Sequence, residues 1–268
     1  MAEPPPVEQT RSGMYPPRME LYEPLFVPKP VGEDLWLVDG PVVRMSYLWG
    51  SFPFPTRMAV VRLRGGDLLL WSPTAPDEGL RSRIDALGRV RHLVSPNKFH
   101  YAHIAAWKRA YPEATAWASP GVRERAASQH IDVSFDADLG EGPAPAWRGE
   151  VDQLVFRGSR LLEEVIFFHR KTRTAILADL IENFEPGKLG GTYGWLVRLA
   201  GAADPDGKTP MDLRMTFWGR KRVARGCLAR MLAWEPEKVI IAHGRPYEEE
   251  GAKELRRAFR WLGPATDA

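Results

Sequence analysis

Val239-Ile240-Ile241-Ala242-His243-Gly244 is a short apolar run that ends in a histidine and a glycine, and it has an earlier counterpart. The run Ala175-Ile176-Leu177-Ala178 ends in the same way, in Asp179. Both runs have the length and composition of buried strands. In an open α/β architecture, the loops that leave the carboxyl ends of neighbouring strands converge on one crevice. We therefore expect the side chains of Asp179 and His243 to meet.

A third run extends this pattern. Val90-Arg91-His92-Leu93-Val94 predicts a short strand, and Ser95 to Tyr101 leaves it before a helical stretch, which places His100 at the same edge. Two imidazoles and one carboxylate are enough for an open divalent metal site with exchangeable positions for water or substrate. The sequence thus predicts His100, Asp179 and His243 as metal ligands.

The remaining chain is β-rich and then α/β, twice over. Apolar runs bounded by turn residues predict strands at 35–38, 58–63, 68–71, 90–94, 114–117, 153–156, 164–168, 174–178 and 239–241. Helical patterns cover 78–87, 103–110, a long region after Pro210 and 248–261. Gly65-Gly66-Asp67 predicts a hairpin turn. Two sheets with helices outside accommodate this order better than one doubly wound sheet does.

Composition limits the domain organisation, the compartment and the partners that the chain can have. Residues 1–30 are proline-rich and predict an extended arm, whereas 31–268 predicts one domain. The single cysteine, Cys227, excludes a disulfide framework and a thiolate-rich zinc site, so a cytoplasmic protein is expected. No apolar run approaches the roughly 20 residues that span a bilayer, and no membrane partner is expected.

These elements resemble the metallo-β-lactamase superfamily. In that fold a later strand ends in a bridging aspartate and a final strand ends in His-Gly, which Asp179 and His243-Gly244 match. Further segments resemble an uncharacterised branch of the superfamily: 70–73, 96–100, 111–114 with Trp107, 164–169 and 174–179. The resemblance covers roughly Leu35 to Leu262. It implies an α/β protein, an αββα sandwich of two mixed sheets with helices on the outer faces.

The chain departs from the superfamily in its histidine motif. Active members carry Thr-His-x-His-x-Asp-His, and laying this motif on residues 95–101 puts Pro96 and Lys98 at the first two histidines, His100 at the aspartate and Tyr101 at the last histidine. Neither proline nor a lysine ammonium has a lone pair to offer a metal. The resemblance therefore implies at most one divalent ion, zinc or iron, or no metal at all.

Neighbouring residues are candidates for catalysis. If 170–173 is a hairpin turn, His169 faces Thr174 and Glu164 faces Asp179, which makes Glu164 a fourth ligand or, with Asp179, a general base. His169 then lies at the far end of the hairpin and is structural. Lys98 is expected to neutralise Asp179 in place of a metal or to orient an anionic substrate. Tyr101 is expected to donate a hydrogen bond to a developing oxyanion.

Each ligand also has a purely structural alternative. His243 could close its strand by bonding to the next loop, Asp179 could cap the following turn through Asn183, and His100 could simply begin the helix. These alternatives stay open at the level of sequence.

Two functional classes follow. The first is a metal-dependent hydrolase, in which the metal acidifies a water for attack on an ester, amide or phosphoester. The second is a metal-free, non-catalytic binding protein that keeps the crevice. The motifs of serine hydrolases, nucleotide hydrolases and zincins are all missing from the sequence.

Partners are less well defined. The ligand is expected to be a small molecule of unknown identity, bounded by loops at 50–56 and 182–209 with an aromatic rim of Trp49, Phe52, Phe54, Phe184, Tyr193 and Trp195. Basic residues gather after Pro210, at Arg214, Arg220, Lys221, Arg222, Arg225 and Arg230. They predict a solvated helix face, and nucleic acid is not an expected partner because no nucleic-acid motif accompanies them.

Overall fold

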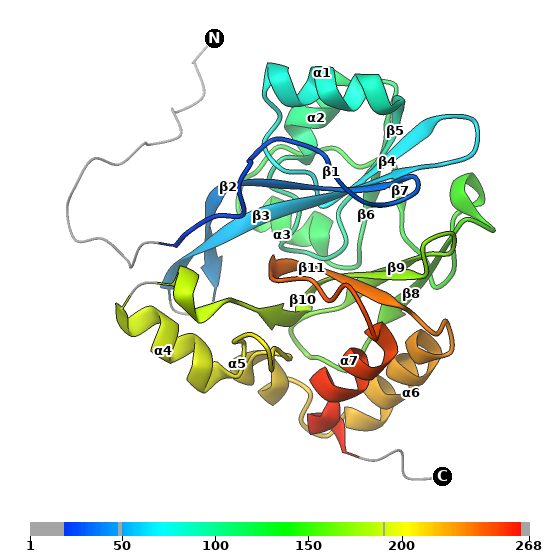
Figure 1. The fold of residues 1–268 in the computed structure, drawn as a ribbon. Helices are drawn as coiled ribbons and strands as arrows, with labels where there is room; N and C mark the ends of the chain where they lie inside the picture. The colour runs from blue at the N-terminus through cyan, green and yellow to red at the C-terminus, as the bar shows by residue number, and fades with distance from the viewer. Residues whose placement is uncertain (1–18, 48–49, 190, 264–268) are drawn as a thin grey trace.

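Two β-sheets stack face to face in the computed structural model, which describes residues 19–47, 50–189 and 191–263. In this part of the chain one sheet has 7 strands in the order β1 to β7, and the other has 4 strands in the order β11-β10-β9-β8. Helices α1 to α3 lie on one side of the sheets and α4 to α7 on the other (Figure 1). The predicted αββα sandwich is confirmed.

The first sheet is antiparallel and then parallel. Its strands are β1 (Lys29–Gly32), β2 (Leu35–Tyr47), β3 (Gly50–Arg62), β4 (Asp67–Trp71), β5 (Arg89–Val94), β6 (Thr115–Ala118) and β7 (Ala137–Asp138). Strands β1 to β4 pair antiparallel, and β4 to β7 pair parallel. The parallel crossovers contain α1 (Glu78–Leu87), α2 (Ile104–Ala110) and α3 (Val122–Ser128).

The second sheet is also mixed. Its strands are β8 (Val151–Phe156), β9 (Glu164–His169), β10 (Thr174–Asn183) and β11 (Lys238–Gly244), with β10 and β11 parallel and the other pairs antiparallel. The helices on its side are α4 (Gly191–Ala200), α5 (Met211–Met215), α6 (Lys221–Leu232) and α7 (Gly251–Ala258). Short 3₁₀ turns cover Pro145–Trp147, Pro186–Lys188 and Arg260–Leu262.

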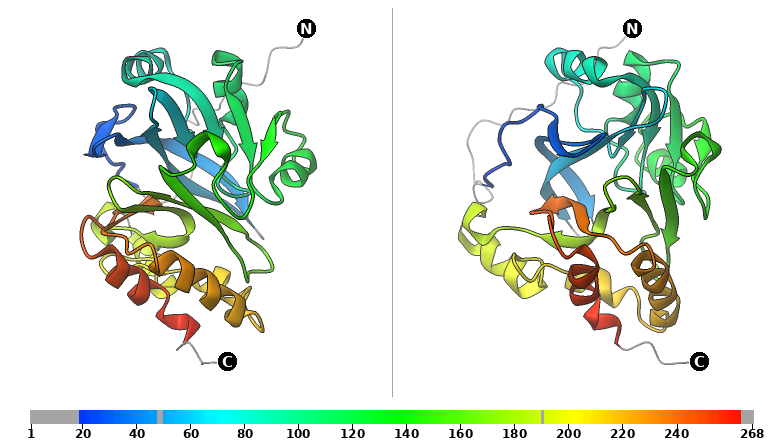
Figure 2. Two further views of the ribbon diagram at one scale, coloured as in Figure 1. Left: turned by 90° about the vertical axis from the view of Figure 1, so that its right-hand side faces the viewer. Right: turned by 45° about the vertical axis from the view of Figure 1, so that its right-hand side comes forward.

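Strand alternation sorts the core into three layers. On β9, Val165 and Phe167 point between the sheets, whereas Ile166 and Phe168 point toward α6 and α7. On β4, Leu69 and Trp71 join the inner layer, and their neighbours pack under α1 and α2. Successive strand residues face opposite sides, so fully apolar strands are what a sheet buried on both faces requires. Figure 2 shows the resulting layers from two further sides.

Most predicted elements are present, with some changes of extent. The predicted helix over 78–87 is confirmed, and Asp77 caps it by accepting a hydrogen bond from the Leu80 N–H at 2.5 Å. The expectation of a loop at 50–56 is wrong, because this segment pairs with β2 as the first half of β3. Strands β1 and β7 and helices α3 and α4 are elements that the patterns did not predict. Helix α4 lies inside the segment 182–209, so the expectation of a loop there is wrong as well.

The N-terminal arm is only partly described. Residues 1–18 lie outside the described residues. Lys29 and Pro30, expected in the arm, belong to β1 and pair with β2. The Lys29 ammonium donates to the Asp39 carboxylate at 2.8 Å, so this part of the arm is bound to the sheet. Within the described ranges no helix is long and apolar enough to cross a membrane.

The hairpin register at the end of β9 is as predicted, and it buries a histidine. His169 faces Thr174, and the His169 Nδ1 lies 2.8 Å from the Thr172 hydroxyl. Burial lowers the pKa of His169 to about 4, so the folded protein keeps this ring neutral where the unfolded chain takes up a proton.

We therefore expect the fold to lose stability as the pH falls from about 6.5 to about 4, by about 2–3 kcal/mol from this group. Denaturant unfolding across this pH range measures the loss, and His169→Gln should flatten it. His130→Asn, a change at an exposed histidine, is the matched control and should keep the slope. An equal slope in wild type and His169→Gln would contradict the assignment.

Candidate metal centre

Three predicted side chains meet at one edge of the sandwich. His100 comes from the turn between β5 and α2, Asp179 from β10 and His243 from β11. The Asp179 Oδ1 lies 3.2 Å from His100 Nε2 and 3.1 Å from His243 Nε2. One ligand atom from each residue lies within 4.8 Å of the other two.

These spacings suit a metal ion. Two ligands bound at about 2.0–2.1 Å to a tetrahedral zinc lie roughly 3.3–3.4 Å apart. The two distances from Asp179 Oδ1 are close to this value. The donor set of two imidazoles and a carboxylate is one that zinc and iron both accept.

Backbone irregularity in β10 allows Asp179 to reach the histidines. Strand β10 does not end at Asp179 but continues to Asn183, and its register against β11 shifts between Leu177 and Glu182. Leu177 faces Ile241 and Glu182 faces His243. An advance of five residues along β10 is therefore matched by an advance of two residues along β11, and the extra residues of β10 form a bulge. The extra residues include Asp179, which the bulge turns toward the strand end.

His100 is held on two sides. The Val165 N–H donates to the Pro96 carbonyl at 2.8 Å, which fixes the turn that carries His100 onto β9. The His100 Nδ1 lies 2.7 Å from the Ser72 hydroxyl. Ser72 follows β4 with a φ of 51°, a left-handed conformation that non-glycine residues rarely adopt. A proton on Nδ1 donated to Ser72 leaves the Nε2 lone pair directed at the site.

His243 is the most exceptional residue of the site. It is 3% exposed, and neither of its ring nitrogens has a hydrogen-bond partner among the residues that the structure describes. Its Nε2 is close to Asp179, but the contact lacks hydrogen-bond geometry. Buried polar atoms are nearly always paired, because an unpaired one costs about 1–3 kcal/mol. An unpaired imidazole nitrogen beside a carboxylate oxygen fits the role of a metal ligand.

Asp179 divides its two oxygens between different partners. Oδ1 faces both histidines, whereas Oδ2 accepts a hydrogen bond from the Asn97 amide at 2.8 Å. Burial acts to raise the pKa of Asp179, but the His100 and His243 rings together outweigh burial and the net pKa is lowered. For His100, burial acts to lower the pKa, but the Asp179 and Glu164 carboxylates together outweigh burial, so the net pKa is raised. Burial lowers the pKa of His243.

Glu164 supports Asp179 from behind. Its Oε1 accepts from the Ala178 N–H at 2.8 Å, and its Oε2 accepts from the Asp179 N–H at 2.8 Å and from the Asn97 amide at 3.1 Å. Burial, followed by the Asp179 charge, raises the pKa of Glu164 to about 7, although the two backbone donors act in the opposite direction. Both carboxylate oxygens are therefore engaged, and Glu164 is placed to hold the bulge of β10.

Glu164→Gln should destabilise the protein by about 2–4 kcal/mol, because either orientation of the amide turns its N–H₂ toward a buried N–H donor. Denaturant unfolding at neutral pH measures the change. Glu163→Gln is the matched control, since Glu163 is 36% exposed and should tolerate the change. A Glu164→Gln variant more stable than wild type would mean that the buried charge, not the hydrogen bonding, dominates at this position.

Arg57 is a structural residue of the site that the sequence did not indicate. It is 3% exposed, its Nε pairs with the Asp39 carboxylate at 2.8 Å, and its Nη1 donates to the carbonyls of Ile241 and Gly244 at 2.9 and 2.5 Å. This guanidinium, on β3 of the first sheet, therefore binds the end of β11 in the second sheet. No local signal marks it, because its carbonyl partners are more than 180 residues away.

Gly244 shows why the strand must end in His-Gly. Its φ is 102°, which favours glycine, and a Cβ there would lie 2.1 Å from the Asn183 carbonyl oxygen. The Arg245 N–H then donates to that same carbonyl at 2.8 Å. The close approach of β11 to β10 thus depends on the missing side chain.

Arg57→Lys should lower stability by about 2–4 kcal/mol, because an ammonium cannot keep the planar pairing with Asp39 and both carbonyls. Because the carbonyls flank His243, metal affinity should fall about 10–100-fold. Unfolding and metal titration measure the two effects. Arg62→Lys, on the same strand but 42% exposed, is the matched control, and an equal effect of the two variants would contradict a special role for Arg57.

Lys98 and Tyr101 do not reach the three ligands. The Lys98 Nζ lies 5.6 Å from the Phe99 ring centroid, and its side chain packs near Gly121 at the start of α3. Tyr101 is 7% exposed in the core under the helices of the first sheet. Burial raises its pKa, although Arg125, its hydrogen-bond partner, acts in the opposite direction. The structure thus places neither residue against Asp179, because the turn carries these side chains to the helix side.

Two other expectations concern the surroundings. Asn183, considered as a partner of Asp179, instead donates to Asp204 and the Arg245 carbonyl, each at 2.9 Å. Of the expected aromatic rim, the Phe54 and Phe184 rings lie 5.1 and 6.4 Å from the His243 ring. Trp195 is 62% exposed on α4, and the side chains of Trp49, Phe52 and Tyr193 lie outside the described part.

Glu182 is a carboxyl group that the sequence did not single out. It faces His243 across the strand pair. Burial, and then the Asp179 and Asp212 carboxylates, raise its pKa well above the usual range. Only the bulge in β10 places it there, so its sequence position gave no signal.

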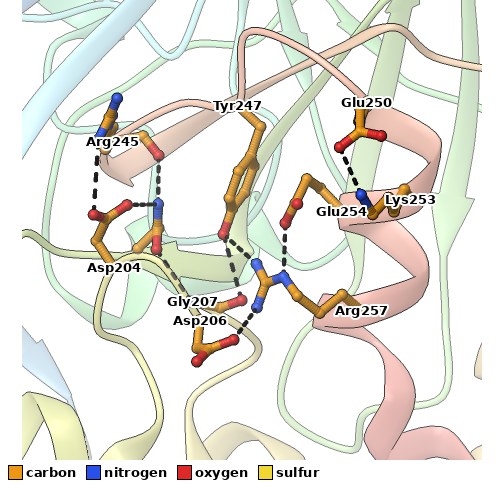
Figure 3. A network of polar contacts seen from close by, with 10 residues as sticks. Asp204, Asp206, Gly207, Arg245, Tyr247, Glu250, Lys253, Glu254 and Arg257 are labelled. Atoms are coloured by element: carbon orange, nitrogen blue, oxygen red, sulfur yellow. Dashed lines mark hydrogen bonds and ion pairs between the residues drawn. The ribbon is translucent and has the colours of Figure 1, made fainter.

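The loop after His243 is bound by a polar network (Figure 3). The Arg257 Nη2 donates to the Tyr247 hydroxyl at 3.0 Å, and its Nη1 lies 3.5 Å from Asp206. Arg245 lies 3.8 Å from Asp204. Two loops and α7 are therefore joined directly beyond the site.

A family model described as a domain of unknown function (DUF4336) matches residues 50–187. The chain belongs to this family. The matched range includes His100, Glu164 and Asp179. A search of curated proteins found no match.

Solved structures share the fold. The metallo-β-lactamase TMB-1 is 15% identical, with a TM-score of 0.58 over 92% of this chain and 100% of that one. DIM-1 metallo-β-lactamase is 14% identical, with a TM-score of 0.58 over 93% and 99%. FIM-1 from Pseudomonas aeruginosa, in a mono-zinc form, is 12% identical, with a TM-score of 0.55 over 93% and 99%. This member of the DUF4336 family therefore has the metallo-β-lactamase fold, as its motifs predicted.

Proposed function

We propose that this protein is a hydrolase that uses one divalent metal ion, zinc or iron, held by His100, Asp179 and His243. The observation that carries the proposal is the buried His243 ring, which has no hydrogen-bond partner among the described residues yet lies 3.1 Å from Asp179 Oδ1. A fold that needed His243 only for packing would gain by an apolar residue there. Its retention beside two further donors supports a ligand role.

One ion rather than two is favoured by the use of Asp179. The Asn97 amide binds Oδ2 and also Glu164, so only Oδ1 of Asp179 faces the two histidines. The positions that correspond to two further histidines hold Pro96 and Lys98. Among the described residues, the donors that meet are those of His100, Asp179 and His243, a set that suits one ion.

A zinc or iron ion in such a donor set acidifies a bound water and so supplies a nucleophile at neutral pH. The chain's own residues supply the rest. Asp179 would hold the ion through Oδ1, while Asn97 and Glu164 hold its carboxylate and its backbone in place. Ser72 orients the His100 ring, and Phe54 and Phe184 exclude water from the side of His243. Esters, amides and phosphoesters are the substrate classes for such chemistry.

The structural neighbours give this proposal limited support. They are metallo-β-lactamases, and one was solved in a mono-zinc form. At 12–15% identity these likenesses establish the fold alone, and the hydrolytic role rests on the site.

A metal-free binding protein is the second candidate, and one contact favours it. The His100 ring lies 3.2 Å from Asp179 Oδ1 and can neutralise that carboxylate by itself when protonated. The buried charge then has a partner without any ion. Metal content separates the two candidates.

Elemental analysis of untagged protein purified without chelator should find about one zinc or iron per chain. Asp179→Ala with His243→Ala should abolish the metal, and Ser72→Ala should retain it with roughly 10–100-fold weaker affinity. His130→Asn is the control variant and should keep full metal content. Loaded protein should then hydrolyse at least one of p-nitrophenyl acetate, an anilide or bis(p-nitrophenyl) phosphate, and the double variant should not.

Wild type that stays metal-free after incubation with zinc, iron and manganese would overturn the metal site and favour the binding protein. Metal retained equally by the double variant would also overturn the assignment of ligands. Stoichiometric metal with no turnover of any of these probes would separate the two parts of the proposal, because it would keep the site and remove the hydrolase.

A further inference from the structure

Exposed apolar side chains concentrate on one region of the surface. Among the described residues, nine large apolar side chains are strongly exposed, and seven of them fall between residues 195 and 223. They are Trp195 (62%), Leu196 (53%), Leu199 (56%), Met211 (52%), Met215 (71%), Trp218 (79%) and Val223 (49%). Single exposed apolar residues need no explanation, but a cluster of this size marks an interaction site.

Two neighbouring helices carry this surface, which we call the α4–α5 face and define by Trp195, Leu196, Leu199, Met211, Met215 and Trp218. On α4 the first three lie on the side opposite to the buried Val197. On α5, Met211 and Met215 are one turn apart, and Leu213 is buried. The Arg214 guanidinium donates to the Ala200 carbonyl at 3.3 Å and so joins α5 to the end of α4. Both helices lie on the same side of the molecule (Figures 1 and 2).

Cations border the apolar residues. A hollow of about 480 Å³ beside α5 is lined by Met211, Met215, Trp218 and Trp261 together with Arg214 and Lys221. Arg198, Arg220 and Arg222 are exposed, and none of them forms an ion pair with a residue that the structure describes. Residues 191–232 contain eight basic and three acidic residues, a net charge of +5, whereas the whole chain carries +3. The segment that carries this face is thus more basic than the chain as a whole.

The basic residues around the α4–α5 face indicate which partner covers it. A second copy of the chain would bring one basic face against another, and like charges oppose that contact. Anionic lipid head groups complement the basic border, while tryptophan, leucine and methionine enter the boundary between head groups and acyl chains. We propose that the α4–α5 face docks this protein on an anionic membrane surface.

Such docking needs no spanning helix. It differs from the sequence-based expectation of no membrane partner, which considered only apolar runs long enough to span a bilayer. The proposal goes beyond the proposed hydrolase function and requires neither metal nor catalysis, so the two can fail separately.

Vesicle co-sedimentation tests the proposal with the full-length chain. Wild type should bind vesicles of phosphatidylcholine mixed with phosphatidylglycerol and should bind vesicles of phosphatidylcholine alone at least tenfold more weakly. Trp195→Ser with Trp218→Ser should lower binding to the anionic vesicles at least tenfold. Arg220→Glu with Arg222→Glu should lower it at least 25-fold, since each basic residue contributes about fivefold. Added salt should weaken wild-type binding.

Matched controls come from the opposite side of the sandwich. Ile131→Ser removes an exposed apolar residue (43%) away from this face, and Arg81→Glu with Arg83→Glu reverses two exposed charges on α1. Both controls should bind vesicles like wild type, and thermal melts should show that every variant is folded.

Three results would overturn the proposal. They are no binding of wild type to anionic vesicles at low salt, binding that the apolar and the charge variants leave unchanged, and a wild-type dimer in light scattering that Trp195→Ser with Trp218→Ser dissociates. The last result would assign the face to a second copy of the chain.

Discussion

The buried guanidinium of Arg57 is the contact on which the geometry of this molecule depends. It lies on β3 of one sheet, is neutralised by Asp39 of β2, and donates to two carbonyls at the end of β11 in the other sheet. The Tyr22 ring, 4.8 Å away, covers it. Burying a charge costs several kcal/mol unless every donor finds a partner. Because these partners come from both sheets, the charge is satisfied only when the sheets adopt this relative position, and that position sets where His243 lies.

A second constraint acts within the second sheet, where the Glu164 carboxylate fixes the backbone that carries Asp179. Glu164 accepts the backbone N–H groups of Ala178 and Asp179, and Asn97 donates to both acids. Two buried acids would repel one another without this shared amide. The arrangement leaves Asp179 with a single oxygen facing the histidines. Asn97 therefore supports both acids and fixes which oxygen of Asp179 faces the histidines.

Sequence reasoning predicted the layers and the convergence of His100, Asp179 and His243, because both follow from local periodicity and from the rule that strand ends meet. It did not find Asn97, Ser72 or Arg57. Apart from Asp39, which lies 18 residues before Arg57, their partners at the site lie between 28 and 187 residues away, and a short pattern does not connect residues so far apart. Lys98 and Tyr101 show a different limit: aligning a motif gives a position along the backbone, but the turn after β5 decides where each side chain points. The segment 50–56 looked like a loop because its prolines, Pro53 and Pro55, disguised a strand.

Helix α4 has apolar side chains on both of its sides, which a helix at the edge of a globular protein does not require. Its inner side is explained by packing, since Val197 joins Phe184, Leu189 and Ala202 in a small buried cluster. Phe184 of this cluster and Phe54, which packs against the cluster, flank the His243 ring. Its outer side has no such explanation within the described chain, and docking on a lipid surface supplies one. If both proposals hold, the same helix faces the membrane on one side and covers the neighbours of a metal ligand on the other.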